Sequence, residues 1–169
     1  MLTTTKEYIM STDIFLRIEG ISGESQDANH KGWINVDSFN WGALQPGNMA
    51  VGGGGGAGKV QYRDLTIQAK IDKATPAVMR YISNGKHISK VEISVCKAGG
   101  SQVEYCRITL EDVLITNVMF NGTTHHDLIG ITYQFQAAKV KNQYWEQLAS
   151  GGKGAESQSG WNIKENQEL

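Results

Sequence analysis

The segment that most resembles a catalytic motif is a glycine-rich run ending in a lysine. From Gly53 to Lys59 the chain reads glycine, four residues, glycine and lysine, the spacing with which a phosphate-binding loop surrounds the phosphates of a nucleotide. Such a loop then needs Ser or Thr to hold magnesium, but the next residue is Val60, and the residues after it favour a strand rather than a helix. We therefore interpret this run as a flexible loop.

The densest cluster of possible metal ligands or general bases is His125-His126-Asp127. Adjacent histidines on a strand point to opposite faces, and in a loop they lack the spacing that assembles a zinc site. His30 and His87 are isolated. A small metal-dependent β-barrel hydrolase built on the cluster stays an alternative, but a polar turn leading into a strand at Leu128 is the favoured interpretation. We predict no catalytic residue, no metal and no cofactor.

The two cysteines, Cys96 and Cys106, flank a sequence typical of a tight turn. A two-residue hairpin at Gly99 and Gly100 would pair Cys96 with Val103, and Cys106 with Ile93. The two thiols would then point to opposite faces of the hairpin, which excludes a disulfide.

Composition excludes several classes of function. The chain has 169 residues, 40% of them hydrophobic, and 16 Lys and Arg balance 17 Asp and Glu for a net charge of −1. This charge balance gives no basic footprint for nucleic acid, and no apolar run is long enough for membrane insertion. The N-terminus lacks the apolar core of a signal peptide, so we expect synthesis in the cytoplasm. We expect a flexible extension at 1–11, one domain at 12–164 and a flexible tail at 165–169.

The chain shows repeated alternation of apolar and polar residues, the pattern of strands with one buried face. It occurs at 14–18, 65–71 and 129–135, where the second face is polar and wettable. In the strand-like segment 108–116 the apolar phase shifts at Glu111-Asp112, which predicts a bulge. The fold class is therefore mainly β, a compact β-barrel or two-sheet sandwich.

One short α-helix, at about residues 75–85, is expected alongside the strands. Thr75 is typical of an N-cap, Pro76 of the first helical position and Gly85 of the C-cap. Between them Val78, Met79 and Ile82 form an apolar stripe that we expect to pack on the core.

Eight segments, in this order, resemble the hemolysin-coregulated protein (Hcp) family, the tube subunit of bacterial type VI secretion. The segments are FLRIEGISGES at 15–25 with Asp27 and His30, INVDSFNWG at 34–42, DLT at 64–66, DKATP at 72–76, GKHI at 85–88, KAGG at 97–100, ITLEDVLIT at 108–116 and GWN at 160–162. The resemblance covers roughly residues 12–164. The five-glycine run and Phe39, where the family often carries Trp, are departures.

The resemblance implies a structural protein without catalytic residues. It implies hexameric rings that stack into a hollow tube, carry small effector proteins in the lumen, meet a valine-glycine-repeat spike protein and are driven out by a contractile sheath. The protein would be secreted by the type VI system into the medium or a target cell. A carbohydrate-binding module, suggested by the four tryptophans, stays a second alternative.

A water-filled lumen needs a polar lining, so the polar positions of alternating strands are candidates. If Phe39 and Trp41 are buried, Ser38 and Asn40 face the lumen together with Gln68 and Lys70. The glycine-rich loop and the turn between the cysteines are candidates for ring-to-ring stacking. Their residues are Pro46, Gly47, Asn48, Gly52, Gly53, Gly54, Gly55, Gly56, Lys59, Ala98, Gly99, Gly100 and Ser101.

Overall fold

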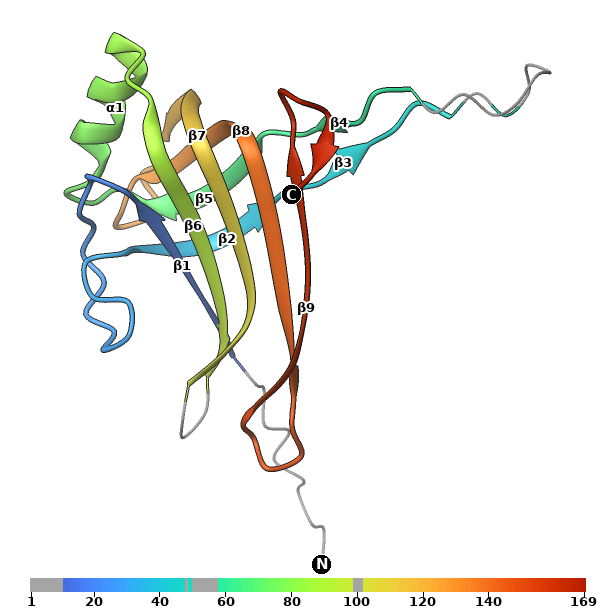
Figure 1. The fold of residues 1–169 in the computed structure, drawn as a ribbon. Helices are drawn as coiled ribbons and strands as arrows, with labels where there is room; N and C mark the ends of the chain where they lie inside the picture. The colour runs from blue at the N-terminus through green and yellow to red at the C-terminus, as the bar shows by residue number, and fades with distance from the viewer. Residues whose placement is uncertain (1–10, 48, 50–57, 99–101) are drawn as a thin grey trace, which may run out of the picture.

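The protein folds as a closed β-barrel, shown by a computed structural model that describes residues 11–47, 49, 58–98 and 102–169 (Figure 1). The main sheet has the order β10-β9-β8-β5-β2-β1-β6-β7, and β7 also pairs with β8, which closes six of the strands into a barrel. The barrel strands are β1 (Thr12–Ile18), β2 (Ile34–Asn40), β5 (Leu65–Lys70), β6 (Ile88–Lys97), β7 (Val103–Asn121) and β8 (Gly130–Gln147). The predicted mainly-β class is confirmed.

Two elements extend the sheet beyond the closed barrel. Strand β9 (Lys153–Asn162) pairs with the second half of β8, and β10 (Gln167–Glu168) pairs with the end of β9. We expected residues 165–169 to be a flexible tail, but main-chain pairing holds Gln167 and Glu168 against the sheet. The expected extension at 1–11 lies outside the described residues except for Ser11.

The core confirms the alternation seen in the sequence. Leu16 and Ile18 of β1 are buried, and so are Leu65 and Ile67 of β5 and Tyr133 of β8, whereas the intervening side chains are half-buried or exposed. Phe15, on the opposite face of β1, is buried as well. Burying one large apolar side chain stabilises a fold by about 1.5–3 kcal/mol. The buried side chains of the six barrel strands form one hydrophobic core.

Helix α1 (Thr75–Asn84) covers one end of the barrel (Figure 1). Gly85 ends the helix with a left-handed φ of 65°, as predicted. Thr75 does not cap the helix as we expected: Ala74 holds the N-cap position, and the Thr75 hydroxyl is buried 2.8 Å from the Tyr133 hydroxyl. Burial raises the pKa of Tyr133 to about 12, so that hydroxyl stays neutral.

The apolar stripe of α1 is narrower than predicted. Val78 is fully buried and Ile82 is half-buried against the core, but Met79 is 38% exposed. In the described residues no helix is long and apolar enough to cross a membrane.

The predicted register of the β6–β7 hairpin is wrong. Val95 pairs with Cys106 and Cys96 pairs with Glu104, with a register shift between them that leaves Tyr105 unpaired. This bulge moves the partners of Cys96 and Cys106, but it keeps the two cysteines on opposite faces, and both are free. Burial raises the pKa of both thiols, which therefore stay protonated and poorly reactive.

The irregularity predicted at Glu111-Asp112 differs in form from a bulge. Asp112 has a left-handed φ of 51°, and the buried positions of β7 change from even to odd numbers there. The pairing with β8 keeps one register across this residue, because Glu111 pairs with Lys139 and Val113 with Ala137. The register shift of β7 lies further on, between Ile115 and Asn117.

A two-stranded arm projects from the barrel on the side away from α1 (Figure 1). It consists of β3 (Ala43–Leu44) and β4 (Gln61–Tyr62), paired as Ala43 with Tyr62 and Leu44 with Gln61. The Trp41 and Tyr62 rings stack with their centroids 5.8 Å apart, which anchors the base of the arm to the barrel.

Candidate functional site: a polar face across four strands

The site that best matches the sequence prediction is the outward face of four neighbouring strands, β2, β5, β8 and β7. Because strands pair residue by residue, their polar side chains form continuous rows across the sheet. One row joins Asn40, Thr66, Gln134 and Asn117, and the next joins Ser38, Gln68 and Thr132. We call these two rows and the adjoining Lys70 the polar face.

Side chains of the polar face bond to one another across the strands. Thr132 Oγ1 donates to Gln68 Oε1 at 2.8 Å, and Gln134 Nε2 donates to Thr66 Oγ1 at 3.0 Å. An amide group has two donors and two acceptor lone pairs, so each glutamine keeps hydrogen-bonding capacity for another molecule. The face is therefore ordered and still able to bind.

A bulge in β2 adds an ion pair to the polar face. The register with β5 shifts between Val36 and Ser38, and Asp37 lies beside Lys70, with Lys70 Nζ 2.7 Å from Asp37 Oδ2. Both side chains are about half exposed, so this pair contributes little stability. Because the charges of Lys70 and Asp37 are opposite, this edge of the polar face is neutral overall.

The four residues predicted from alternation all lie on this one face. Ser38, Asn40, Gln68 and Lys70 are exposed, whereas Phe39 and Trp41 are half-buried against the core. The prediction assumed that Phe39 and Trp41 are buried, and both are half-buried. That the face lines a lumen stays a prediction.

The residues predicted to stack rings divide between the described and undescribed parts of the chain. Pro46, Gly47 and Lys59 are exposed on the arm, and Ala98 follows β6, its N–H donating to the Ser11 carbonyl at 2.9 Å. The others, Asn48, Gly52 to Gly56 and Gly99 to Ser101, lie outside the described residues.

His125, His126 and Asp127 lie in the exposed turn between β7 and β8. As predicted, this segment is a polar turn, although the strand begins at Gly130 rather than Leu128. Within 11–47, 49, 58–98 and 102–169 no three His, Cys, Asp or Glu side chains come together as a metal site would require.

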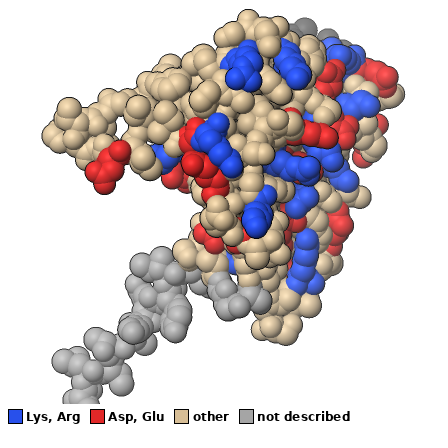
Figure 2. All heavy atoms as spheres, turned by 90° about the vertical axis from the view of Figure 1, so that its left-hand side faces the viewer, with Lys and Arg blue, Asp and Glu red and all other residues tan. Residues whose placement is uncertain are grey.

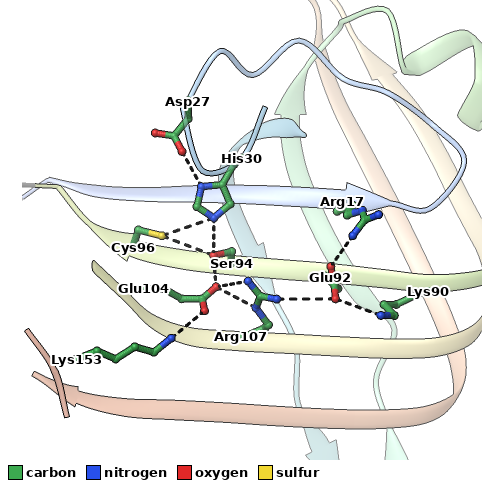
Figure 3. Close-up of polar contacts among 10 residues, drawn as sticks. All are labelled: Arg17, Asp27, His30, Lys90, Glu92, Ser94, Cys96, Glu104, Arg107 and Lys153. Atoms are coloured by element: carbon green, nitrogen blue, oxygen red, sulfur yellow. Dashed lines mark hydrogen bonds and ion pairs between the residues drawn. The ribbon is translucent and has the colours of Figure 1, made fainter. Parts of the chain in front are cut away.

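A second polar cluster, which sequence reasoning missed, lies under the loop at 19–33 (Figure 3). His30 Nδ1 donates to Asp27 Oδ2 at 2.7 Å, and His30 Nε2 lies 3.0 Å from Ser94 Oγ. The His30 ring also stacks on Phe15 with centroids 4.2 Å apart. Because His30 and Ser94 are 64 positions apart, no local motif could have revealed the contact.

Charged residues of β6 and β7 complete this cluster (Figure 3). Ser94 Oγ donates to the Glu104 carboxylate, which Arg107 also contacts with Nη2 at 2.8 Å and Lys153 with Nζ at 3.4 Å. Burial alone would raise the pKa of Glu104, but the hydrogen bond from Ser94 and the nearby cations outweigh it, so the pKa lies below its usual range. The hydrogen bond from His30 likewise lowers the pKa of Asp27.

The order Asp27, His30, Ser94 is that of a hydrolase triad, but its surroundings give it another role. Ser94 is 0% exposed, and its hydroxyl proton is directed at Glu104 rather than at a space where a substrate could lie. The contacts instead join the 19–33 loop to β6. We interpret this cluster as a clamp that holds the loop on the barrel.

Comparisons with known proteins agree on one family. The family model described as "Type VI secretion system effector, Hcp" matches residues 15–144. The chain is 42% identical to "Protein hcp1" of Pseudomonas aeruginosa over 159 residues, which are 93% of this chain and 98% of that protein. A solved "Structure of a type six secretion system protein" superposes with a TM-score of 0.89 at 25% identity, covering 94% of this chain and 100% of that one. Hcp1 from Salmonella typhimurium gives a TM-score of 0.78 at 31% identity, covering 95% and 100%.

Proposed function

The chain belongs to the Hcp family of type VI secretion proteins, and on this premise we propose that it is the repeating subunit of the secretion tube. Copies form hexameric rings, the rings stack into a hollow tube, and the polar face lines the lumen. The observation that carries the proposal is the continuous polar face across β2, β5, β8 and β7.

The chemistry of the polar face suits transport of folded proteins. Its groups are mainly neutral amides and hydroxyls with spare hydrogen-bonding capacity, and its ion pair is internally neutral. A lining of this kind stays wetted and offers many weak contacts without a strong preference for one charge. Several such contacts from different subunits add up, so small effector proteins are held reversibly. A bound effector is also stabilised in its folded state by mass action.

The closed barrel suits a part that transmits mechanical force. Each of the six barrel strands is hydrogen-bonded to a neighbour on either side along part of its length, so a force on one end is passed through the closed sheet to the whole subunit. The arm and the β6–β7 hairpin project beyond the barrel and are the proposed contacts between successive rings. The spike protein and the contractile sheath are the proposed partners at the tip and outside of the tube.

The proposal is tested first by the native mass of the purified protein. We expect one closed particle of six copies, and a monomer at micromolar concentration would contradict the proposal.

A second test, Asn40→Trp, places a large aromatic side chain on the polar face. We expect rings of unchanged mass that no longer retain co-expressed effector proteins. Asn142→Trp, the same substitution at an exposed position of β8 outside the polar face, is the matched control. Equal effector retention by both variants would show that the polar face is not the lumen.

A further inference from the structure

Two positions of the chain carry an asparagine followed directly by a glycine, Asn84-Gly85 and Asn121-Gly122. An asparagine in this pair loses its side-chain amide most readily, because glycine has no side chain to keep its backbone nitrogen away from the asparagine Cγ. Both asparagines are exposed to solvent. Sequence and exposure are therefore alike at the two sites, and a difference in reactivity has to come from the backbone around them.

The first pair is fixed at the end of a helix. Asn84 is the last residue of α1, and the N–H of Gly85, which has a left-handed φ of 65°, donates to the Tyr81 carbonyl. Asn84 Oδ1 accepts a hydrogen bond from the Lys86 N–H at 2.9 Å. Loss of the amide requires the Gly85 nitrogen to reach the Asn84 Cγ, and these hydrogen bonds hold both groups in place. The helix end therefore protects Asn84.

The second pair lies where β7 ends and the connection to β8 begins. Asn121 is the last residue of β7, and its pairing with Gly130 is the last of the β7–β8 ladder. Among the described residues, none accepts a hydrogen bond from the Gly122 N–H. Asn121 Nδ2 donates to Thr132 Oγ1 at 3.4 Å, which is long for a hydrogen bond. Because the ends of strands open locally at little cost, the Gly122 nitrogen can reach the Asn121 Cγ.

We propose that Asn121 is a site of spontaneous deamidation, with water as the co-reactant. The Gly122 nitrogen gives up its proton and bonds to the Asn121 Cγ, the bond between Cγ and Nδ2 breaks, and Nδ2 leaves as ammonia with that proton. The product is a cyclic imide, which water opens at either carbonyl. Opening at Cγ gives aspartate, and opening at the main-chain carbonyl gives isoaspartate, through whose Cγ the main chain then runs. Either product carries a carboxylate in place of the amide.

The new carboxylate changes the edge of the polar face. Lys70 and Asn121 are the two neighbours of Gly130 in the sheet. Lys70 is paired with Asp37, so this edge is neutral before the change. A carboxylate at position 121 makes the edge negative, and it has no proton to donate to Thr132.

The surrounding segment makes this change of charge large. From Val113 to Ala138 the chain carries a single charged residue, Asp127. Figure 2 shows a projection with one acidic group on it, beside a surface where Lys, Arg, Asp and Glu are mixed. A second carboxylate doubles the charge of this segment. The deamidation does not depend on the proposed function, but one consequence rests on it, because in the tube the lumen lining of aged copies becomes acidic at this edge.

The rates of conversion at the two asparagines test the proposal within one protein. Trypsin cuts after Lys and Arg, so Asn84 lies in the peptide 81–86 and Asn121 in the peptide 108–139. The purified protein is kept at neutral pH for several days, and mass spectrometry with fragmentation measures the converted share at each asparagine. We expect Asn121 to convert at least about ten times faster than Asn84. In guanidinium chloride the fold no longer distinguishes the sites, and the two rates should become similar.

Gly122→Ala tests the attacking atom. A methyl group beside this nitrogen hinders its approach to Cγ, so conversion of Asn121 should slow by about tenfold or more. No atom lies within 4 Å of an added Cβ, and the φ of Gly122 is not left-handed, so the fold accommodates alanine. Gly42→Ala is the matched control, because Gly42 has equally open surroundings but follows Trp41, and it should leave the rate unchanged. Thermal unfolding checks that both variants are folded.

Asn121→Asp supplies the reference for the product, and aged parent protein should gain a species that elutes with it on anion exchange. Equal rates at Asn84 and Asn121 in the folded protein, or an unchanged rate in Gly122→Ala, would overturn the proposal. Conversion of Asn121 in a protein that stays monomeric would support the deamidation and contradict only the proposed tube.

Discussion

At the scale of single residues, the contact between His30 and Ser94 is what ties the 19–33 loop to the barrel. His30 is buried between Asp27 and Ser94 and stacks on Phe15, so it fills space as well as pairing polar groups. His30 therefore holds the 19–33 loop against the barrel through contacts with Phe15 of β1 and Ser94 of β6.

We expect His30→Ala to lower the free energy of unfolding by about 2–4 kcal/mol. The change leaves a cavity against Phe15 and removes one of the partners of the buried Ser94 hydroxyl, which keeps its hydrogen bond to Glu104. Chemical denaturation measures the difference. His126→Ala is the control, because His126 is exposed in a turn and its loss should change stability by less than about 0.5 kcal/mol. Equal effects of the two variants would contradict the role of the clamp.

Glu104 makes the free energy of unfolding depend on pH. Its pKa is lowered in the folded protein, so the stabilisation it provides is present above the unfolded pKa of about 4.3 and is lost as the pH falls through the folded value. Glu104→Gln removes the titrating group. We expect the unfolding free energy of the variant to fall less steeply than that of the parent between about pH 5 and pH 3. Parallel pH profiles would show that Glu104 is not stabilised by its neighbours.

At the scale of elements, helix α1 is joined to the barrel by a hydrogen bond inside the core. Thr75 and Tyr133 are both buried, and their hydroxyls are 2.8 Å apart. The sequence placed the helix and its C-terminal glycine correctly. It misassigned Thr75 as a cap, because a threonine before a proline has the same local pattern whether its hydroxyl meets its own helix or a strand 58 positions away.

Tyr133→Phe tests this attachment by deleting one hydroxyl. Thr75 keeps only its contact with the Asp72 N–H, and we expect a loss of about 1–2 kcal/mol in unfolding free energy. Tyr144→Phe is the matched control, since Tyr144 is 50% exposed and should lose almost nothing. Indistinguishable denaturation curves for the two variants would show that the hydrogen bond contributes no net stability.

The arm is the element that we assign to contacts between rings. Within the described residues its two halves are joined by the pairing of β3 with β4 and by the hydrogen bond from Gln45 Nε2 to the Gly58 carbonyl at 2.6 Å, and Leu44, Pro46 and Gly47 are exposed. Deletion of Gly52 to Gly56 should therefore leave ring mass unchanged and shorten the tubes seen by electron microscopy. Tubes of unchanged length would remove the arm from the stacking contact.

At the scale of the whole molecule, the surface carries balanced charge. The net charge is −1, and the ion pairs at the exposed sheet face, such as Lys70 with Asp37, are individually weak. Screening of these pairs by salt should therefore change any association of copies little.

Ring mass should consequently resist salt. Raising sodium chloride from about 0.1 to 1 M shortens the Debye length from about 10 to 3 Å and screens exposed ion pairs, but leaves apolar burial intact. We expect hexamers at both concentrations by light scattering. Dissociation into monomers at high salt would show that charge pairs hold the ring.

The sequence alone determined which faces of β2 and β5 are polar. Alternation with a period of two is local, so Ser38, Asn40, Gln68 and Lys70 could be assigned to polar strand faces before any fold was known. The resemblance of eight ordered segments to the Hcp family likewise implied a β-barrel or two-sheet sandwich before the structure was known.

Only the tertiary structure decided which polar residues meet and which surfaces project. A bulge of one residue changes every cross-strand partner beyond it, as the register at Cys96 shows, and such shifts leave the hydrophobic pattern almost unchanged. The contact of His30 with Ser94 likewise joins residues 64 positions apart. The barrel itself needs the pairing of β1 with β6 and of β5 with β8, strands far apart in the chain, and no local pattern encodes these pairings.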